Sequence, residues 1–229
     1  MHKKQLSEQE IRTRFITPAI KKAGWGAAQI REEYSITAGR IIARGGSCKR
    51  EKAKFADYVL FHKPHQPLAV IEAKDNNHAL GAGMQQALDY AQRLMVPFVF
   101  SSNGDGFVFH NRLEENDGKE VILSNDDFPS PQELWQRYKN LTGVNEQQEC
   151  LIEQPYYVER EEKTPRYYQL CAINSAVNAI AKGQNRLLLV MATGTGKTYT
   201  AFQIIWRLWK AGAKKRILFL ADRNALIDQ

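Results

Sequence analysis

A glycine-rich turn between two regularly patterned segments constrains the fold of this chain more than any other feature. The apolar run Leu187–Met191 has the composition of a buried strand, and the segment from Lys197 to about Lys210 has helical spacing. Between them, residues 192–198 read Ala-Thr-Gly-Thr-Gly-Lys-Thr. Glycines let backbone N–H groups wrap a phosphate, and a helix N-terminus adds partial positive charge. The sequence therefore predicts a strand, a phosphate-binding turn and a helix, in that order.

The residues of this turn also indicate its ligand. Lys197 is placed to reach the β- and γ-phosphates of a nucleotide, and the Thr198 hydroxyl is placed to ligate Mg²⁺. Met191 stands where the general pattern has its first glycine, and this form resembles the turn of superfamily 2 helicases. We therefore expect ATP to bind at Thr193, Gly194, Thr195, Gly196, Lys197 and Thr198.

Two flanking segments resemble further motifs of these helicases. Arg166–Gln169 resembles the Q motif, and the resemblance implies that Gln169 reads the adenine edge. Residues 217–223 resemble motif Ia, which faces the DNA backbone. The tyrosines of the first segment could instead serve packing, and Asp222 with Arg223 could simply begin a helix.

The same region predicts the start of a RecA-like domain. A helix from Thr164 to Ala181 and a strand from Arg216 to Ala221 would complete a βαβ unit around the turn. Up to Gln229 the chain has no acidic D-E-x-H box and no second RecA-like lobe. We expect this chain by itself to be an incomplete ATPase.

The N-terminal part has the pattern of a mixed α/β unit. A helix over Ser7–Ala23 is predicted by apolar spacing, by a capping box from Ser7 to Glu10, and by Gly24 just past the end. Residues 39–54 are glycine-broken and basic, which predicts a loop that contacts DNA phosphates or is merely solvated. The other expected elements are antiparallel strands over 55–61 and 68–74, a helix over 83–94, strands over 97–101 and 107–110, and a short helix with Trp135 and Tyr138.

Two acids and a lysine form the candidate catalytic group. Strand alternation places Glu72 and Lys74 on one face, and an adjacent strand would bring Asp57 beside them. Two carboxylates suit Mg²⁺, which polarises a scissile phosphate and activates water, while an ammonium stabilises the developing charge. The competing interpretation is an ion pair at an exposed strand end, but unpaired charges inside an apolar strand are costly. We therefore predict Asp57 and Glu72 as metal ligands and all three residues as catalytic.

Resemblance to known nucleases extends this set. Asp57, Glu72 and Lys74 resemble the D…ExK core of restriction-endonuclease-like enzymes, and Gln86 with Tyr90 resembles the QxxxY element beside that core. The resemblance implies that Gln86 and Tyr90 contact DNA or buttress the metal site; a polar helix face is the alternative. Glu8, with Arg12, fits an E-x-x-x-R pattern and is a further candidate, although a helical Glu–Arg pair is the alternative.

Taken in order along the chain, these motifs resemble the restriction (R) subunit of type I restriction-modification enzymes. The resemblance implies a nuclease domain over 1–145, a linker over 146–164 and an incomplete superfamily 2 motor domain over 165–229. It also implies cleavage of double-stranded DNA, ATP-driven translocation by the full-length subunit, methyltransferase (M) and specificity (S) subunits as partners, and a role in antiviral defence. Type III subunits carry the nuclease at the other end.

Composition is consistent with a DNA partner in the cytoplasm. The formal net charge is +7, which favours a polyanion. Three widely spaced cysteines suit a reducing compartment, and no apolar run is long enough to span a membrane.

Two other functions fit parts of the pattern. A DNA repair or defence helicase whose N-terminal domain grips DNA without cutting would bind DNA tightly without Mg²⁺. An ATP-dependent protein remodeller with a basic adaptor would show no DNA-stimulated ATPase activity in the full-length protein.

Overall fold

The chain forms two compact units, Met1–Gly143 and Val144–Gln229, called unit 1 and unit 2 below. The computed structural model describes residues 2–37, 41–44, 47–50, 53–114, 120–158 and 164–220. Unit 1 is a mixed α/β unit, whereas the described part of unit 2 contains helices and irregular segments without a strand.

A six-stranded sheet forms the centre of unit 1, with the strand order β1-β4-β5-β6-β7-β8. β5 and β6 pair in parallel, and the other neighbouring pairs are antiparallel. The parallel pair requires a crossover, which the helix α3 supplies. The strands are β1 Ile30–Thr37, β4 Lys54–Lys63, β5 Gln66–Ala73, β6 Phe98–Ser102, β7 Phe107–Asn111 and β8 Val121–Leu123.

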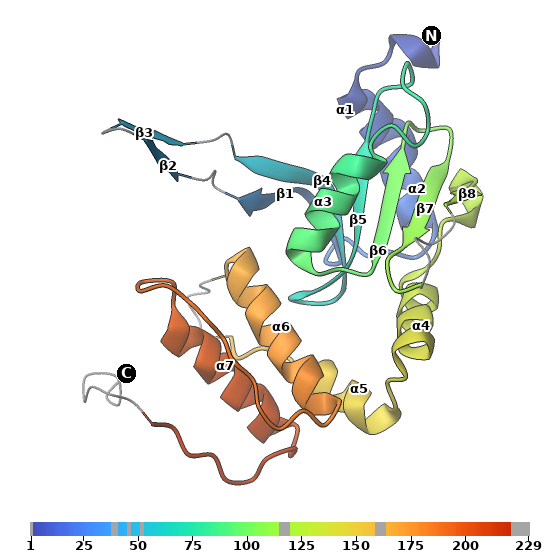
Figure 1. The fold of residues 1–229 in the computed structure, drawn as a ribbon. Coiled ribbons are helices and arrows are strands. Elements are labelled where there is room, and N and C mark those ends of the chain that lie inside the picture. The colour runs from blue at the N-terminus through green and yellow to red at the C-terminus, as the bar shows by residue number, and fades with distance from the viewer. Residues whose placement is uncertain are drawn as a thin grey trace. The chain divides into compact units, whose positions relative to one another are not determined.

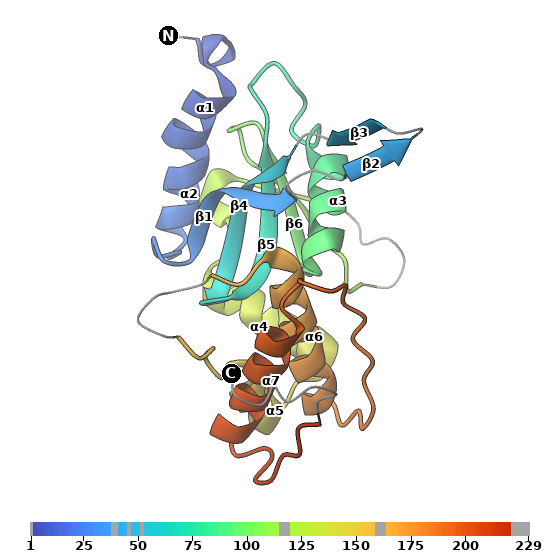
Figure 2. The ribbon, with the colours of Figure 1, turned by 90° about the vertical axis from the view of Figure 1, so that its left-hand side faces the viewer.

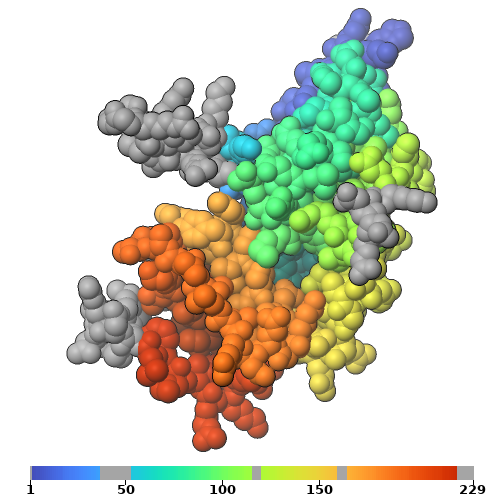
Figure 3. All heavy atoms as spheres, in the orientation of Figure 1, coloured from blue at the N-terminus to red at the C-terminus, as the bar shows by residue number. Residues whose placement is uncertain are grey.

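Helices cover both faces of this sheet (Figures 1 and 2). On one face lies the N-terminal helix, which runs through α1 Glu8–Ile11, a π-helical segment η2 Arg12–Ile16 and α2 Thr17–Lys22. On the other face lies α3 Met84–Leu94, whose green atoms lie at the front of unit 1 in the space-filling view (Figure 3). Because β5 and β6 lie between these layers, their apolar residues are buried on both sides.

Most elements expected in unit 1 are confirmed. The Ser7 side chain and Glu10 form the capping box, and Gly24 follows the helix with φ +95°. The strands expected over 55–61 and 68–74 pair antiparallel as β4 and β5. The helix with Trp135 and Tyr138 forms as α4 Pro131–Thr142, and its two rings stack. Shorter elements are η1 Lys3–Gln5 and η3 Asn125–Asp127.

The prediction of a loop over residues 39–54 is wrong in part. Its backbone forms an antiparallel hairpin, β2 Ile41–Arg44 with β3 Ser47–Arg50, and Lys54 begins β4. The hairpin is a separate two-stranded sheet because its strands pair only with each other. Its basic side chains between Arg40 and Lys52 lie outside the described residues, whereas Lys54 forms an ion pair with Asp89.

Three helices organise unit 2. α6 Tyr167–Ala181 and α7 Lys197–Lys210 match the two helices expected there, whereas α5 Glu146–Ile152 lies within the segment expected as a linker. The helices pack through buried Leu151, Val177 and Leu208. None of the described helices has the length and hydrophobicity needed to cross a membrane.

The strands expected over Leu187–Met191 and Arg216–Ala221 do not form in the described residues. Leu188 is 86% exposed and Leu218 is 82% exposed, so the described residues leave one side of each segment open. A strand needs a hydrogen-bonded neighbour, and no described segment of unit 2 pairs with either run. The strand prediction, which rested on composition, is therefore wrong for the described residues. Ala221, Asp222 and Arg223 lie outside the described residues.

Candidate active site

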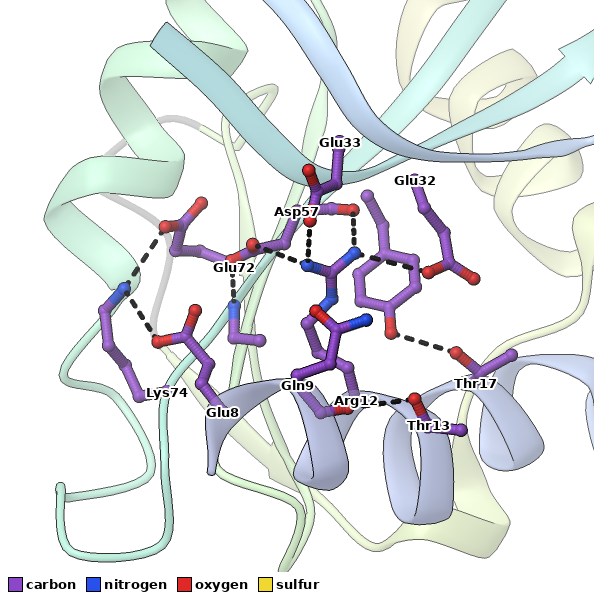
Figure 4. Close-up of polar contacts among 12 residues, drawn as sticks. Glu8, Gln9, Arg12, Thr13, Thr17, Glu32, Glu33, Asp57, Glu72 and Lys74 are labelled. Atoms are coloured by element: carbon purple, nitrogen blue, oxygen red, sulfur yellow. Dashed lines mark hydrogen bonds and ion pairs between the residues drawn. The ribbon is translucent and has the colours of Figure 1, made fainter. Parts of the chain in front are cut away.

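Asp57, Glu72 and Lys74 come together at one end of the β4–β5 pair (Figure 4). The register that pairs Tyr58 with Ile71 sets Asp57 opposite Glu72. Lys74 Nζ lies 3.2 Å from Glu72 Oε1, and the Ala73 backbone N–H donates to Asp57 Oδ2 over 2.8 Å. The expected side-by-side arrangement of the three residues is therefore observed.

The surrounding strands hold this end of β5 in place. The Lys74 backbone N–H donates to the Ser102 carbonyl of parallel β6 over 2.8 Å, which extends the pairing one residue past β5. On the α3 side, Gly83 packs against Glu72, since a Cβ atom there would lie 3.0 Å from both Glu72 Cγ and Ser101 Oγ. The glycine thus allows the first turn of α3 to approach the acidic side chain closely.

Glu72 has the most unusual electrostatics of the group. It is 3% exposed, and its Oε2 atom has no hydrogen-bond partner among the described residues. Burial, followed by the nearby Asp57 carboxylate, raises the pKa of Glu72 to about 8, against the lowering effect of Lys74. A buried carboxylate with an unsatisfied oxygen is costly unless a cation or proton accompanies it.

The N-terminal helix brings Glu8 to the same place. Its Oε2 atom lies 4.0 Å from Lys74 Nζ, and burial together with Asp57 raises the pKa of Glu8. The expected alternative, a Glu8–Arg12 helical pair, is not what forms, because Arg12 pairs with Glu32, Glu33 and Asp57. Glu8 is thus the second carboxylate beside Lys74 and the third acid of the site, with Asp57 and Glu72.

Gln86 and Tyr90 lie on α3 and contact each other. Gln86 Nε2 donates to Tyr90 Oη over 3.1 Å, with Gln86 exposed and Tyr90 buried. Among the described contacts, neither side chain bonds to Asp57, Glu72 or Lys74. The structure therefore places the pair on the helix whose first turn contacts Glu72, with Gln86 about one turn and Tyr90 about two turns beyond Gly83.

The donor set fits a hard divalent cation. Mg²⁺ is commonly held by one or two carboxylates and keeps several waters. Asp57 and Glu72 supply two carboxylates, and the unpartnered Glu72 Oε2 is an available oxygen ligand. No group of three or more potential ligands is arranged as a complete cage in the described part of the chain. The site thus suits a partly hydrated ion rather than one enclosed by protein.

The phosphate turn forms without its flanking strand. Gly194 and Gly196 adopt φ +76° and +82°, and Gly196 is the N-cap of α7. Lys197 Nζ approaches the Met191 carbonyl at 3.4 Å, and Thr195 Oγ1 donates to the Ala192 carbonyl. Thr193 lies in the turn, and Thr198 lies in the first turn of α7.

Gln169 contacts this turn directly. Its Nε2 atom donates to the Thr195 carbonyl over 2.9 Å, and its Oε1 atom accepts from the Arg166 backbone N–H. A Cβ atom at Gly196 would collide with the Gln169 amide. Both polar ends of the amide therefore bond protein groups, whereas the resemblance implied contact with adenine.

The sequence indicated Arg12 only as the partner of Glu8 in the E-x-x-x-R pattern and did not single out Glu33, so neither was predicted as a residue of the site. Arg12 lies on the buried face of the N-terminal helix with Ile16 and Ile20, and a charge among apolar residues at helical spacing is a signal available in the sequence. Glu33 carries no comparable signal, because its contact with Arg12 depends on the position of β1.

Two known families match the chain. The family described as type I restriction enzyme R protein N terminus matches residues 7–129, more than half of the chain. The family described as type III restriction enzyme, res subunit, matches residues 162–229. The two matches fall on the nuclease-like and helicase-like motifs respectively.

Individual relatives agree with these families. The chain is 56% identical over 226 residues to the type I restriction enzyme EcoAI endonuclease subunit of Escherichia coli, covering 98% of this chain and 28% of that protein. It is 29% identical over 279 residues to the EcoKI endonuclease subunit of Escherichia coli, covering 99% and 24% respectively. The chain thus spans about a quarter of the length of these relatives.

A solved structure is also similar. It is described as a fragment of an HsdR subunit of a type I restriction enzyme from Vibrio vulnificus, and it superimposes with a TM-score of 0.78 at 39% identity. The match covers 90% of this chain and 38% of the other. With the family match over residues 7–129, these similarities show that the chain belongs to the R-protein family of type I restriction enzymes.

Proposed function

We propose that unit 1 is a Mg²⁺-dependent endonuclease domain that cleaves double-stranded DNA. The observation that carries the proposal is the meeting of Asp57, Glu72 and Lys74, with one buried Glu72 oxygen left without a partner. The fold would be that of restriction-endonuclease-like enzymes, within a domain of residues 1–145.

The residues would divide the chemistry as follows. Asp57 and Glu72 would hold Mg²⁺, which when bound polarises the scissile phosphate and lowers the pKa of water. Lys74 would donate from its ammonium to a phosphate oxygen as negative charge develops there, while Glu72 keeps it in place at 3.2 Å. Glu8 would orient a water that completes the coordination, and Gln86 with Tyr90 would position the DNA backbone.

Unit 2 would serve the motor of the longer protein. The domain start over residues 165–229 would bind ATP through Gln169 and residues 193–198, and the full-length subunit would couple ATP hydrolysis to DNA translocation. Because the relatives are subunits by name, we extend the proposal to M and S subunits as partners, in a cytoplasmic restriction complex directed at foreign DNA.

Cleavage of supercoiled plasmid by the 229-residue chain tests the nuclease proposal. With Mg²⁺ we expect weak nicking, which Asp57→Ala and Lys74→Ala each reduce by about 100-fold because they remove a metal ligand and a charge donor. Asp126→Ala, which removes an exposed carboxylate paired with Lys22, is the control and should cleave like the wild type. Equal cleavage by all four proteins would refute the assigned site.

The same assay separates cutting from gripping. A domain that only binds DNA would retain DNA in gel-shift experiments with a chelator and show no nicking with Mg²⁺. The buried Glu72 oxygen that has no hydrogen-bond partner among the described residues argues against that alternative, because binding a phosphate alone would not require a buried acid with an open oxygen.

A further inference from the structure

Arg12 is a buried cation beside the candidate metal ligands (Figure 4). It is 4% exposed, and its guanidinium contacts three carboxylates. Nη1 lies 2.9 Å from Glu33 Oε1 and 3.5 Å from Asp57 Oδ1, and Nη2 lies 3.2 Å from Glu32 Oε2. Nη2 also donates to the Asp57 backbone carbonyl over 3.4 Å. The guanidinium thus contacts both the main chain and the side chain of Asp57.

Packing fixes the plane of this guanidinium. It lies over the Tyr58 ring, 5.1 Å from the centroid, and the Tyr58 hydroxyl is hydrogen-bonded to Thr17 Oγ1 at 2.9 Å. Burial of the guanidinium opposes its charge, but bonds to Glu33 and Tyr58 and the charge of Asp57 together raise the pKa of Arg12. Arg12 therefore remains charged and is restricted to one orientation.

Two uncommon backbone conformations help to place these groups. The helix changes to π-helical geometry over Arg12–Ile16, beginning at the arginine itself. On β1, Glu33 adopts φ +50°, which is unfavourable for a residue with a side chain. π-helical turns and left-handed non-glycine residues both concentrate at functional sites, because each costs energy that other contacts must offset. Here the π-helical segment begins at Arg12 and the left-handed residue is Glu33, so the two conformations occur at the two partners of one ion pair.

The two oxygens of Asp57 are held from different elements. Oδ2 accepts from the Ala73 N–H of β5, and Oδ1 faces Arg12 of the N-terminal helix. Lys74 is bound instead to Glu72, so the two cations have separate partners. Without Arg12, only one bond in the described structure would restrain the Asp57 carboxylate.

From these contacts we propose that Arg12 is a positioning residue, which orients Asp57 for the metal and is itself anchored by Glu33. The proposal rests on the proposed function, since it assumes that Asp57 holds Mg²⁺. The proposal predicts the direction in which loss of Arg12 changes the affinity for Mg²⁺. A cation near a metal ligand weakens metal binding by repulsion, whereas a cation that pre-orients the ligand strengthens it.

The test is Mg²⁺ binding by the 229-residue chain, measured by calorimetry, together with the Mg²⁺ concentration that gives half-maximal plasmid nicking. Arg12→Met keeps the apolar stem, and we expect it to weaken Mg²⁺ binding about tenfold, as for loss of other groups that orient metal ligands. The half-maximal Mg²⁺ concentration should rise by the same factor. Arg12→Lys, which keeps the charge but not the planar fork, should recover part of the affinity.

Two further variants complete the experiment. Arg14→Ala removes an exposed arginine of the same helix that pairs with Glu10, and it should bind Mg²⁺ like the wild type. Glu33→Gln removes the anchor's charge and should weaken Mg²⁺ binding several-fold, in the same direction as Arg12→Met. If Arg12→Met unfolds, as judged by circular dichroism, then Arg12→Lys and Glu33→Gln decide the question.

The outcomes separate this inference from the nuclease proposal. If Mg²⁺ binds the wild type but not Asp57→Ala, and Arg12→Met, Arg12→Lys and Glu33→Gln bind it as tightly as the wild type or more tightly, Arg12 is not a positioning residue. If the wild type does not bind Mg²⁺, or Asp57→Ala binds it equally well, the nuclease proposal fails and the role of Arg12 fails with it.

Discussion

At the scale of single residues, Glu72 shows how burial changes chemistry. The carboxyl group lies in a strand whose neighbours are apolar, and burial with the adjacent Asp57 raises its pKa to about 8. The native state therefore binds a proton more tightly than the unfolded state, in which the pKa is 4.5. The stability that Glu72 contributes is fully present below its pKa in the unfolded state, and it is lost as the pH rises through its pKa in the folded state.

The raised pKa of Glu72 makes the stability of the metal-free chain depend on pH. In the presence of a chelator, the Glu72→Gln substitution should remove this contribution. The free energy of unfolding of the variant should therefore fall less than that of the wild type between about pH 6 and about pH 9. The difference should be on the order of 3 kcal/mol. Urea unfolding at both pH values measures it, because other titrating groups are common to the two proteins. Parallel pH profiles would show that Glu72 does not titrate in this range.

At the scale of elements, the helices of unit 2 are joined by a buried polar network. Arg207 of α7 donates to Asn174 Oδ1 of α6 over 2.8 Å and to the Ile152 carbonyl at the end of α5, and it lies over the Tyr156 ring. On the same helix, Gln203 both donates to and accepts from the Tyr157 backbone. The segment after α5 is thus fastened to the helix that begins at the phosphate turn.

Removing the arginine should loosen this unit selectively. Arg207→Met removes the hydrogen bonds that Arg207 donates to Asn174 Oδ1 and to the Ile152 carbonyl, which should destabilise unit 2 by about 2–3 kcal/mol, while the Tyr156 hydroxyl still donates to Asn174 Oδ1. Hydrogen exchange should rise in α5, α6 and α7 but not in the six-stranded sheet. Lys210→Met, which alters a more exposed cation on the same helix, is the control and should leave exchange unchanged. Equal exchange in both variants would contradict the network's role.

At the scale of the whole molecule, two apolar segments are not covered by the described part of the chain. Leu188 and Val190 in one run, and Leu218 and Leu220 in the other, are each more than 80% exposed. Exposed apolar segments of this kind bind hydrophobic dyes and promote association.

Dye binding therefore tests this feature of the chain. Combined Leu188→Ser and Leu218→Ser should lower the fluorescence of a bound naphthalene sulfonate dye roughly twofold and reduce concentration-dependent self-association. Met95→Ser, at an exposed position in unit 1, should change neither. Unchanged dye binding in the double variant would mean that the two segments are not the exposed surface.

Elements defined by local signals could be predicted from the sequence. The capping box at Ser7 and Glu10 begins the first helix, and short apolar runs rich in β-forming residues define β4 and β5. The predicted antiparallel pairing of those strands brought Asp57 beside Glu72 and Lys74, whereas the register that sets Asp57 opposite Glu72 came from the structure. The short edge strand β8 and the hairpin β2–β3 carried no clear local signal.

Other features were decided only by the tertiary structure. The partners of Arg12, the raised pKa of Glu72 and the close approach of Gly83 depend on residues far apart in the chain. The apolar runs beside the phosphate turn had strand composition, yet no neighbour pairs with them in the described residues. The sequence by itself determined the elements whose hydrogen bonds are local or whose partner strand is adjacent. Pairing between distant segments, and the burial that shifts protonation, exist only once the chain has folded.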